Sequence, residues 1–125
     1  MQAITVADGD YERCRRNVDF IKKHVFPGCC IPSLEVLGDA ASRDAGLRLE
    51  DVEDITAHYA QTLRVWRSNL DRNEREIRTL GYSEEFVRLW RFYFAYCEGG
   101  FDERTIQDVQ IVWAGPDRRS GARNG

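Results

Sequence analysis

The sequence predicts an α/β fold whose elements follow the order βα-α-β-αα-β. Three short segments have the apolar pattern of strands, and they cover residues 2–6, 47–51 and 105–113. The longer segments between them carry apolar residues at helical spacing. Taken in order, these elements match the second half of a doubly wound sheet, with extra helices inserted before the last strand.

The first strand, Gln2–Val6, precedes a helix that is predicted over Tyr11–His24. Pro27 ends this helix, because the residue before a proline disfavours the helical conformation. Ser33 is a natural N-cap, and it predicts a second helix over Leu34–Arg43.

The second strand begins after Gly46, which ends the preceding helix. Leu47 and Leu49 alternate with charged residues, and this pattern predicts a strand that ends at about Asp51. We interpret Val52–Ala57 as a connecting segment.

Two long amphipathic helices come next, and each has a clear start or stop signal. Gly81 ends the first. Ser83 begins the second, with Glu84 and Glu85 in the first turn, where their charges suit the helix dipole. Gly99-Gly100 is predicted to close it. The apolar stripes consist of Tyr59, Leu63, Trp66, Leu70 and Ile77 in the first helix and of Phe86, Trp90, Tyr93 and Cys97 in the second.

The last strand, Thr105–Trp113, carries apolar residues on both faces, as a sheet that is covered on both sides requires. Residues 1–115 are therefore predicted to form one domain. Residues 116–125 are predicted to be a disordered polar tail.

Composition and charge narrow the function classes. The 125 residues are 42% hydrophobic, which is enough for one core and too much for a disordered chain. The net charge of -3 gives no general electrostatic reason to bind nucleic acid. No apolar run approaches the roughly 20 residues of a membrane span, and no signal peptide is recognisable. We expect a cytoplasmic protein without a nucleic-acid partner.

Neither metal-binding nor cofactor-binding spacings occur in the sequence. Cys14, Cys29, Cys30 and Cys97 include no CxxC pair, so no metal site is predicted. Reduced thiols are expected in this compartment. No Gly-x-Gly-x-x-Gly segment follows a strand, so no cofactor-binding residue is predicted in the chain.

Three segments carry a family resemblance when they are taken together. They are Phe26–Ser33, then His58–Leu63 with Trp66, and finally Tyr93–Phe101 followed by Thr105–Gln107. In this order and spacing they closely resemble the C-terminal half of the cyclopropane fatty acid synthases. That family transfers a methyl group from S-adenosylmethionine to the cis double bond of a phospholipid acyl chain. The resemblance covers nearly the whole chain.

The resemblance implies that residues 1–115 are the C-terminal part of a Rossmann-like class I methyltransferase domain. The family's glycine-rich cofactor loop lies upstream of the region that matches, and the sequence lacks it. We therefore expect a fragment or split subunit of a methyltransferase that methylates or cyclopropanates unsaturated phospholipid acyl chains. Alone it would be inactive and bind no cofactor. The alternative is a non-catalytic lipid-binding or regulatory remnant that pairs with a full-length synthase.

The resemblance also implies the cofactors and partners of the complete enzyme. Its cofactors would be S-adenosylmethionine and bicarbonate. Its partners would be phospholipid acyl chains, a peripheral contact with the inner membrane, and an N-terminal methyltransferase half or full-length homologue. A basic helix near the start fits either a solvated face or a contact with lipid phosphates. Its charged residues are Arg13, Arg15, Arg16, Lys22 and Lys23.

The candidate catalytic residues Tyr59, Gln2 and Ile4 follow from the same resemblance. In these synthases a bicarbonate ion acts as the general base. Tyr59 matches the tyrosine that donates a hydrogen bond to it, while Gln2 and Ile4 stand where many members have a histidine and an isoleucine. Glutamine offers an N–H₂ donor but cannot carry a proton. Spacing alone also fits Tyr59 as a core residue of an amphipathic helix.

Aromatic residues have a use in this chemistry, because aromatic faces stabilise the carbocation that alkene methylation creates. Plain packing between the two long helices is the alternative. The turn after the first helix resembles one near the family's substrate entrance, where glycine is common at the position of Cys29, so strained left-handed backbone is expected there. The candidate substrate-pocket residues are Phe26, Trp66, Trp90 and Tyr93.

Overall fold

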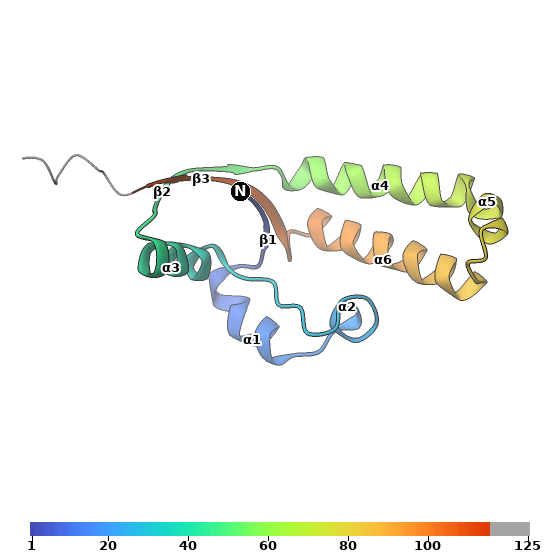
Figure 1. The fold of residues 1–125 in the computed structure, drawn as a ribbon, viewed down its shortest axis with the longest axis horizontal. Coiled ribbons are helices and arrows are strands. Elements are labelled where there is room, and N and C mark those ends of the chain that lie inside the picture. The colour runs from blue at the N-terminus through green and yellow to red at the C-terminus, as the bar shows by residue number, and fades with distance from the viewer. Residues whose placement is uncertain (116–125) are drawn as a thin grey trace, which may run out of the picture.

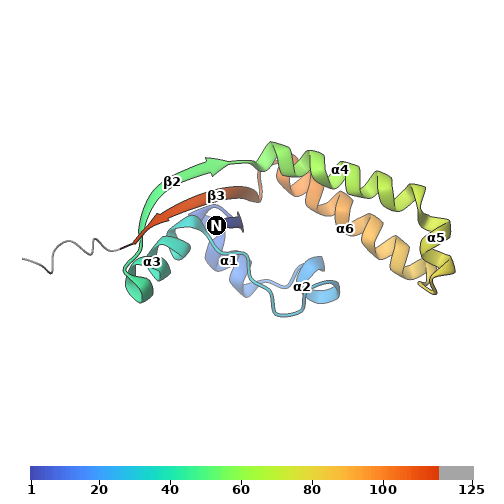
Figure 2. The ribbon, with the colours of Figure 1, turned by 45° about the horizontal axis from the view of Figure 1, so that its top comes forward.

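A computed structural model describes residues 1–115 and shows a three-stranded sheet from which a long helical hairpin projects (Figures 1 and 2). The strands are β1 (Gln2–Thr5), β2 (Arg48–Asp54) and β3 (Gln107–Ala114), in the order β1-β3-β2. β3 pairs antiparallel with both neighbours, so β1 and β2 run parallel to each other on either side of the last strand. The predicted α/β class is confirmed. The predicted tail at 116–125 lies outside the described residues.

The prediction of one continuous helix over Tyr11–His24 is wrong. The segment is divided into α1 (Tyr11–Arg16) and α2 (Phe20–His24), after a 3₁₀ turn at 8–10. Asn17 between them is extended. The carboxylate of Asp19 then caps α2 by accepting a hydrogen bond from the main-chain N–H of Lys22 at 2.9 Å. This new N-cap explains why the helix restarts instead of continuing.

Helix α3 (Leu34–Ala45) begins where the sequence predicts and ends two residues beyond the expected Arg43. The hydroxyl of Ser33 accepts a hydrogen bond from the main-chain N–H of Val36. Gly46 ends the helix in the left-handed conformation, with φ at 62°.

The segment Val52–Ala57, which was predicted to be a connection, instead contains the end of the second strand and the start of the long helix. β2 runs on to Asp54, whose carboxylate accepts a hydrogen bond from Thr56 N–H at 2.9 Å and starts α4 (Thr56–Arg72). The long helix is also not continuous, because Asn73 separates α4 from α5 (Glu74–Thr79). Gly81, with φ at 97°, ends the unit as predicted.

Helix α6 (Glu84–Asp102) begins after the cap Ser83 as predicted, but Gly99-Gly100 does not close it. The helix continues for another half turn, and the left-handed residue is Arg104, with φ at 54°. Gly100 is needed for packing instead, because a Cβ atom there would lie 3.1 Å from the side chain of Ile106.

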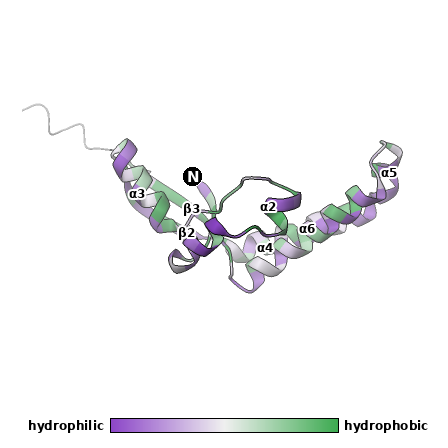
Figure 3. Cartoon of the chain, turned by 90° about the horizontal axis from the view of Figure 1, so that it is seen from below, coloured by the Kyte–Doolittle hydropathy of each residue, from purple (hydrophilic) through white to green (hydrophobic). Residues whose placement is uncertain are grey.

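Helices α4 and α6 lie side by side and form the hairpin, along which hydrophilic and hydrophobic segments alternate (Figures 1 and 3). Their buried contact is centred on Ala60, Leu63 and Phe101, close to the sheet. No helix within residues 1–115 is long and apolar enough to cross a membrane. The core therefore lies where the base of the hairpin meets β1 and β3.

Candidate functional site

An apolar cavity of about 450 Å³ lies at the base of the hairpin. Four predicted site residues line it, and each comes from a different segment: Ile4 from β1, Phe26 from the turn after α2, Tyr59 from α4 and Tyr93 from α6. Gln2, Trp66 and Trp90 are not among its lining residues. The other lining residues are Val6, Cys14, Asp19, Ile21, Cys29, Ile31, Leu63, Tyr96, Cys97, Gly99, Gly100, Phe101, Glu103, Thr105 and Ile106.

Tyr59 is held in the cavity wall by edge-to-face contacts with two aromatic rings. The ring centroid of Phe101 lies 5.1 Å away and that of Trp66 lies 6.1 Å away. Trp66 therefore supports Tyr59 from the same helix without lining the cavity itself, and Trp66 is 44% exposed.

Tyr93, which also lines the cavity, has a similar arrangement. Its ring meets Phe26 at 6.0 Å and Trp90 at 5.2 Å, both edge to face. Burial is the largest cause that raises the pKa of the Tyr93 hydroxyl, so it stays a neutral phenol over the physiological range. Trp90, like Trp66, stands behind a lining tyrosine.

The hydroxyl of Tyr59 is a polar group on a mostly apolar wall. It forms no hydrogen bond with another residue in the described part of the chain. Burial, followed by the negative charge of Asp108, raises the pKa of this hydroxyl above its ordinary value. Tyr59 is therefore a neutral hydrogen-bond donor that is available to a bound molecule.

Asp108 is a site feature that the sequence did not predict. Its side chain is 0% exposed, and one carboxylate oxygen, Oδ2, accepts a hydrogen bond from Gln2 Nε2 at 2.6 Å. The other oxygen, Oδ1, has no partner among residues 1–115. The only sequence signal is an acidic residue inside an apolar strand, directly before Val109.

The main chain of Asp108 is tied to the start of α4. Its N–H donates to Thr56 Oγ1 at 3.1 Å, and its carbonyl accepts from Ile55 N–H at 2.9 Å. Asp108 pairs with Ile4 across the sheet, and its main-chain groups point away from β1. This is therefore a non-hydrogen-bonded pair, and the N–H of Ile4 points to the outer edge of β1. On that edge Val6 N–H donates to the carbonyl of Pro32 at 3.0 Å, and within residues 1–115 no strand pairs with Ile4 there.

The expectation of left-handed backbone at Cys29 is wrong. Gly28, with φ at 81°, takes that conformation, and the N–H of Cys29 then closes a turn by donating to the carbonyl of Phe26 at 3.1 Å. Arg104 is the one non-glycine residue with positive φ in the described range. The turn thus presents Phe26 to the cavity without strain at Cys29.

The thiols of Cys14, Cys29 and Cys97 line the cavity, whereas the side chain of Cys30 is exposed and does not. All four are free thiols. Burial raises the pKa of the Cys97 thiol to about 11. Cys97 therefore behaves as a small apolar residue at neutral pH.

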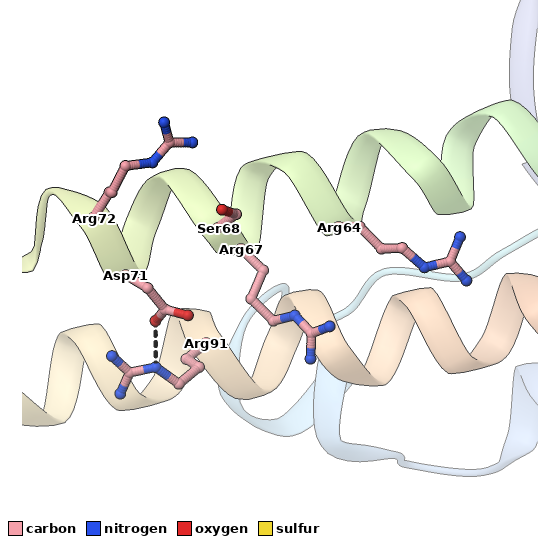
Figure 4. Close-up of a pocket in the computed structure, with 6 residues that line it drawn as sticks. All are labelled: Arg64, Arg67, Ser68, Asp71, Arg72 and Arg91. Atoms are coloured by element: carbon pink, nitrogen blue, oxygen red, sulfur yellow. Dashed lines mark hydrogen bonds and ion pairs between the residues drawn. The ribbon is translucent and has the colours of Figure 1, made fainter.

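A second depression, between α4 and α6, is lined by arginines (Figure 4). Arg64, Arg67 and Arg72 project from α4, and Arg91 from α6. Most of their charge is balanced by acids on the facing helix. The ion pairs include Arg91–Asp71 at 2.7 Å, Arg64–Glu98 at 2.9 Å and Arg67–Glu98 at 2.9 Å, and Arg64 also pairs with Asp102. We therefore interpret this groove as part of the hairpin's packing and not as a binding site.

Comparisons with known proteins agree on one family. A family model described as mycolic acid cyclopropane synthetase matches residues 1–111. The tuberculostearic acid methyltransferase UfaA1 of Mycobacterium tuberculosis is 37% identical over 118 residues, which are 93% of this chain and 28% of that protein. The cyclopropane-fatty-acyl-phospholipid synthase of Escherichia coli strain K12 is 35% identical over 99 residues, covering 78% of this chain and 25% of that protein. The chain thus spans about a quarter of the length of these relatives.

The solved structures include a similar fold. The crystal structure of the mycolic acid cyclopropane synthase CmaA1 complexed with SAH and CTAB matches with a TM-score of 0.76 and 26% sequence identity. The match covers 90% of this chain and 42% of that chain.

Proposed function

Because the chain belongs to the mycolic acid cyclopropane synthetase family, we propose that it forms the acyl-binding part of a methyltransferase that methylates or cyclopropanates unsaturated phospholipid acyl chains. The family uses S-adenosylmethionine and acts on lipid acyl chains. The observation that carries the proposal is the aromatic cavity of about 450 Å³ at the base of the hairpin. Ligand sites in proteins commonly have volumes of about 300–1,000 Å³ and mostly apolar walls.

The cavity walls suit the chemistry of alkene methylation. A sulfonium donor supplies an electrophilic methyl group, and its transfer to a double bond leaves a carbocation on the acyl chain. Tyr59, Phe101 and Tyr93 surround the cavity with aromatic rings, which stabilise a cation without attacking it. The apolar walls exclude water that would trap the cation. The chain has no glycine-rich loop, so no residue here is assigned to the methyl donor.

The residues fit an external bicarbonate ion only in part. Tyr59 and Ile4 would hold such an ion through a free hydroxyl and a main-chain N–H. Gln2 fits this role only with one of its two amide N–H groups, because the other already donates to Asp108. An ionised carboxylate at that point repels a second anion. We therefore assign no step to bicarbonate.

Cysteine protection tests whether the cavity takes an acyl chain. The full chain is alkylated at mildly alkaline pH with and without a phospholipid that carries a cis-unsaturated acyl chain, and each thiol is followed by mass spectrometry. We expect the lipid to slow the modification of Cys14, Cys29 and Cys97. Cys30 is the internal control, because it is adjacent to Cys29 and exposed.

Equal modification of the cavity thiols with and without lipid would count against the proposal. Protection of all four cysteines would indicate a general effect such as aggregation or lipid adsorption. Acyl binding also suits the alternative of a non-catalytic lipid-binding module. Methyl transfer by an enzyme that contains this chain separates the two.

A further inference from the structure

The buried carboxyl group of Asp108 has no part in the function proposed so far. It is 0% exposed, and its position is fixed from two sides. The amide of Gln2 on β1 donates to Oδ2 at 2.6 Å, and Thr56 at the start of α4 binds its main chain. A buried polar oxygen without a partner is costly, so the unpaired Oδ1 calls for an explanation.

Asp108 lies beside the cavity residues that the family resemblance connects with an anion. Ile4, its direct partner across the sheet, lines the cavity. Tyr59 follows Thr56 by three residues on α4, which places the two on the same face of the helix. The charge of Asp108 is also close enough to Tyr59 to raise the pKa of its hydroxyl.

No positive charge within residues 1–115 neutralises Asp108. The groups that face it are the amide of Gln2 from β1, Thr56 and Tyr59 from α4, the main-chain N–H of Val109, and the carboxylate of Asp54 at the end of β2. Arg104, a nearby cation, pairs with Asp54 at 2.8 Å. Burial and Asp54 favour the protonated carboxyl, while the hydrogen bond from Gln2 and the nearby main-chain N–H of Val109 favour its ionised form.

We propose that the Asp108 carboxylate is a built-in anion, which occupies one N–H of the Gln2 amide in place of an external bicarbonate ion and keeps such an ion out of the site by its charge. This inference rests on the proposed function, since it concerns the anion of that same site. Asp108 acts here as a positioning residue. It fixes the amide of Gln2, and its charge repels a second anion beside Tyr59. The unpaired oxygen Oδ1 of Asp108 is then the part of this internal anion that can still accept a hydrogen bond.

Bicarbonate binding to the full chain tests the proposal at about pH 8, where an ordinary carboxyl group is ionised. Nuclear magnetic resonance follows the side-chain N–H₂ of Gln2 and the main-chain N–H of Tyr59 as sodium bicarbonate replaces sodium chloride. We expect no saturable shift in the wild type. Asp108→Asn keeps the shape and removes the charge, and we expect it to bind bicarbonate at least about tenfold more tightly. Asp51→Asn, on exposed strand β2, is the matched control and should behave like the wild type.

Two results would overturn the proposal. One is equal bicarbonate binding by the wild type and Asp108→Asn. The other is the absence of a saturable bicarbonate-dependent shift in both proteins, because removal of the Asp108 charge should allow the ion to bind. If Asp108→Asn does not fold, the NMR chemical shift of the Asp108 carboxyl carbon in the wild type reports whether this carboxyl group is protonated. A protonated Asp108 at about pH 8 contradicts a built-in anion, and an ionised one supports it. The cysteine protection experiment does not depend on Asp108, so failure here leaves the proposed acyl site intact.

Discussion

At the scale of single residues, the structure gathers chemistry that lies far apart in the sequence. Ile4, Phe26, Tyr59 and Tyr93 line one cavity although they belong to four different segments. Their residue types and the family resemblance were readable from the sequence. Asp108 was not, because one acid in an apolar strand gives no hint of its partner until β1 and β3 are paired. Burial and the contact with Gln2 make it a site residue.

Tyr59→Phe tests the free hydroxyl on the cavity wall. The ring contacts with Phe101 and Trp66 remain, and no hydrogen bond within the described residues is lost. We expect the free energy of unfolding to change by less than about 0.5 kcal/mol, below the usual value of one hydrogen bond. In an active enzyme that contains this chain, loss of one hydrogen bond from Tyr59 to the bound molecule, about 1 kcal/mol, should lower turnover by about fivefold. Urea unfolding and methyl-transfer rates measure the two effects, and an unchanged rate would remove Tyr59 from the reaction.

At the scale of elements, short-range signals predicted helix ends better than helix continuity. Ser33, Ser83, Gly46 and Gly81 cap or end helices as expected, because a cap depends on one residue and its near neighbours. The breaks before α2 and after α4 were missed, since apolar spacing continues across them. The glycine pair in α6 was also misread, because the packing of Ile106 against it is a long-range fact of the fold.

The two adjacent glycines of α6 should respond differently to alanine. A Cβ atom at Gly99 meets nothing within 4 Å, so Gly99→Ala should stabilise the chain by about 0.5–1 kcal/mol through helix propensity. At Gly100 the Cβ atom would lie 3.1 Å from Ile106. Gly100→Ala should therefore lose that gain and be less stable than Gly99→Ala by about 1 kcal/mol. Thermal unfolding compares the two, and equal stability would show that Ile106 yields freely.

The junction of β2 and α4 predicts a dependence of stability on pH. Hydrogen bonds from Thr56 and Arg104 lower the pKa of Asp54 from 3.8 to about 2. Since the folded pKa is below the unfolded one, Asp54 stabilises the fold above about pH 4, and this contribution is lost as the pH falls towards about 2. Solvent screens this exposed group, so we expect only about 0.5–1 kcal/mol.

Asp54→Asn is the variant that isolates this effect. Denaturant unfolding across the same pH interval should show a smaller acid-induced loss of stability than in the wild type. Parallel curves for the two proteins would mean that Asp54 keeps its ordinary pKa in the fold.

At the scale of the whole molecule, the α/β class was predictable and the sheet order was not. Alternation and spacing identify strands and helices, but they carry no information on which strand lies in the centre. The last strand, β3, lies between β1 and β2, and that position brings Asp108 to Gln2 and to the start of α4. The cavity likewise forms only because the hairpin returns to the sheet beside β1. Topology, more than any single motif, assembles the proposed site.

Methyl transfer is the most direct test of the central claim, that this cavity holds the acyl chain of a methyltransferase reaction. The chain is joined to the N-terminal part of a family synthase and incubated with S-adenosylmethionine, labelled in its methyl group, and a cis-unsaturated phospholipid. The account predicts that label enters the acyl chain and that Tyr59→Phe lowers the rate by about fivefold, the value of one hydrogen bond. A joined protein that is folded, binds the methyl donor and protects its cavity thiols with lipid, yet transfers no label, would contradict it.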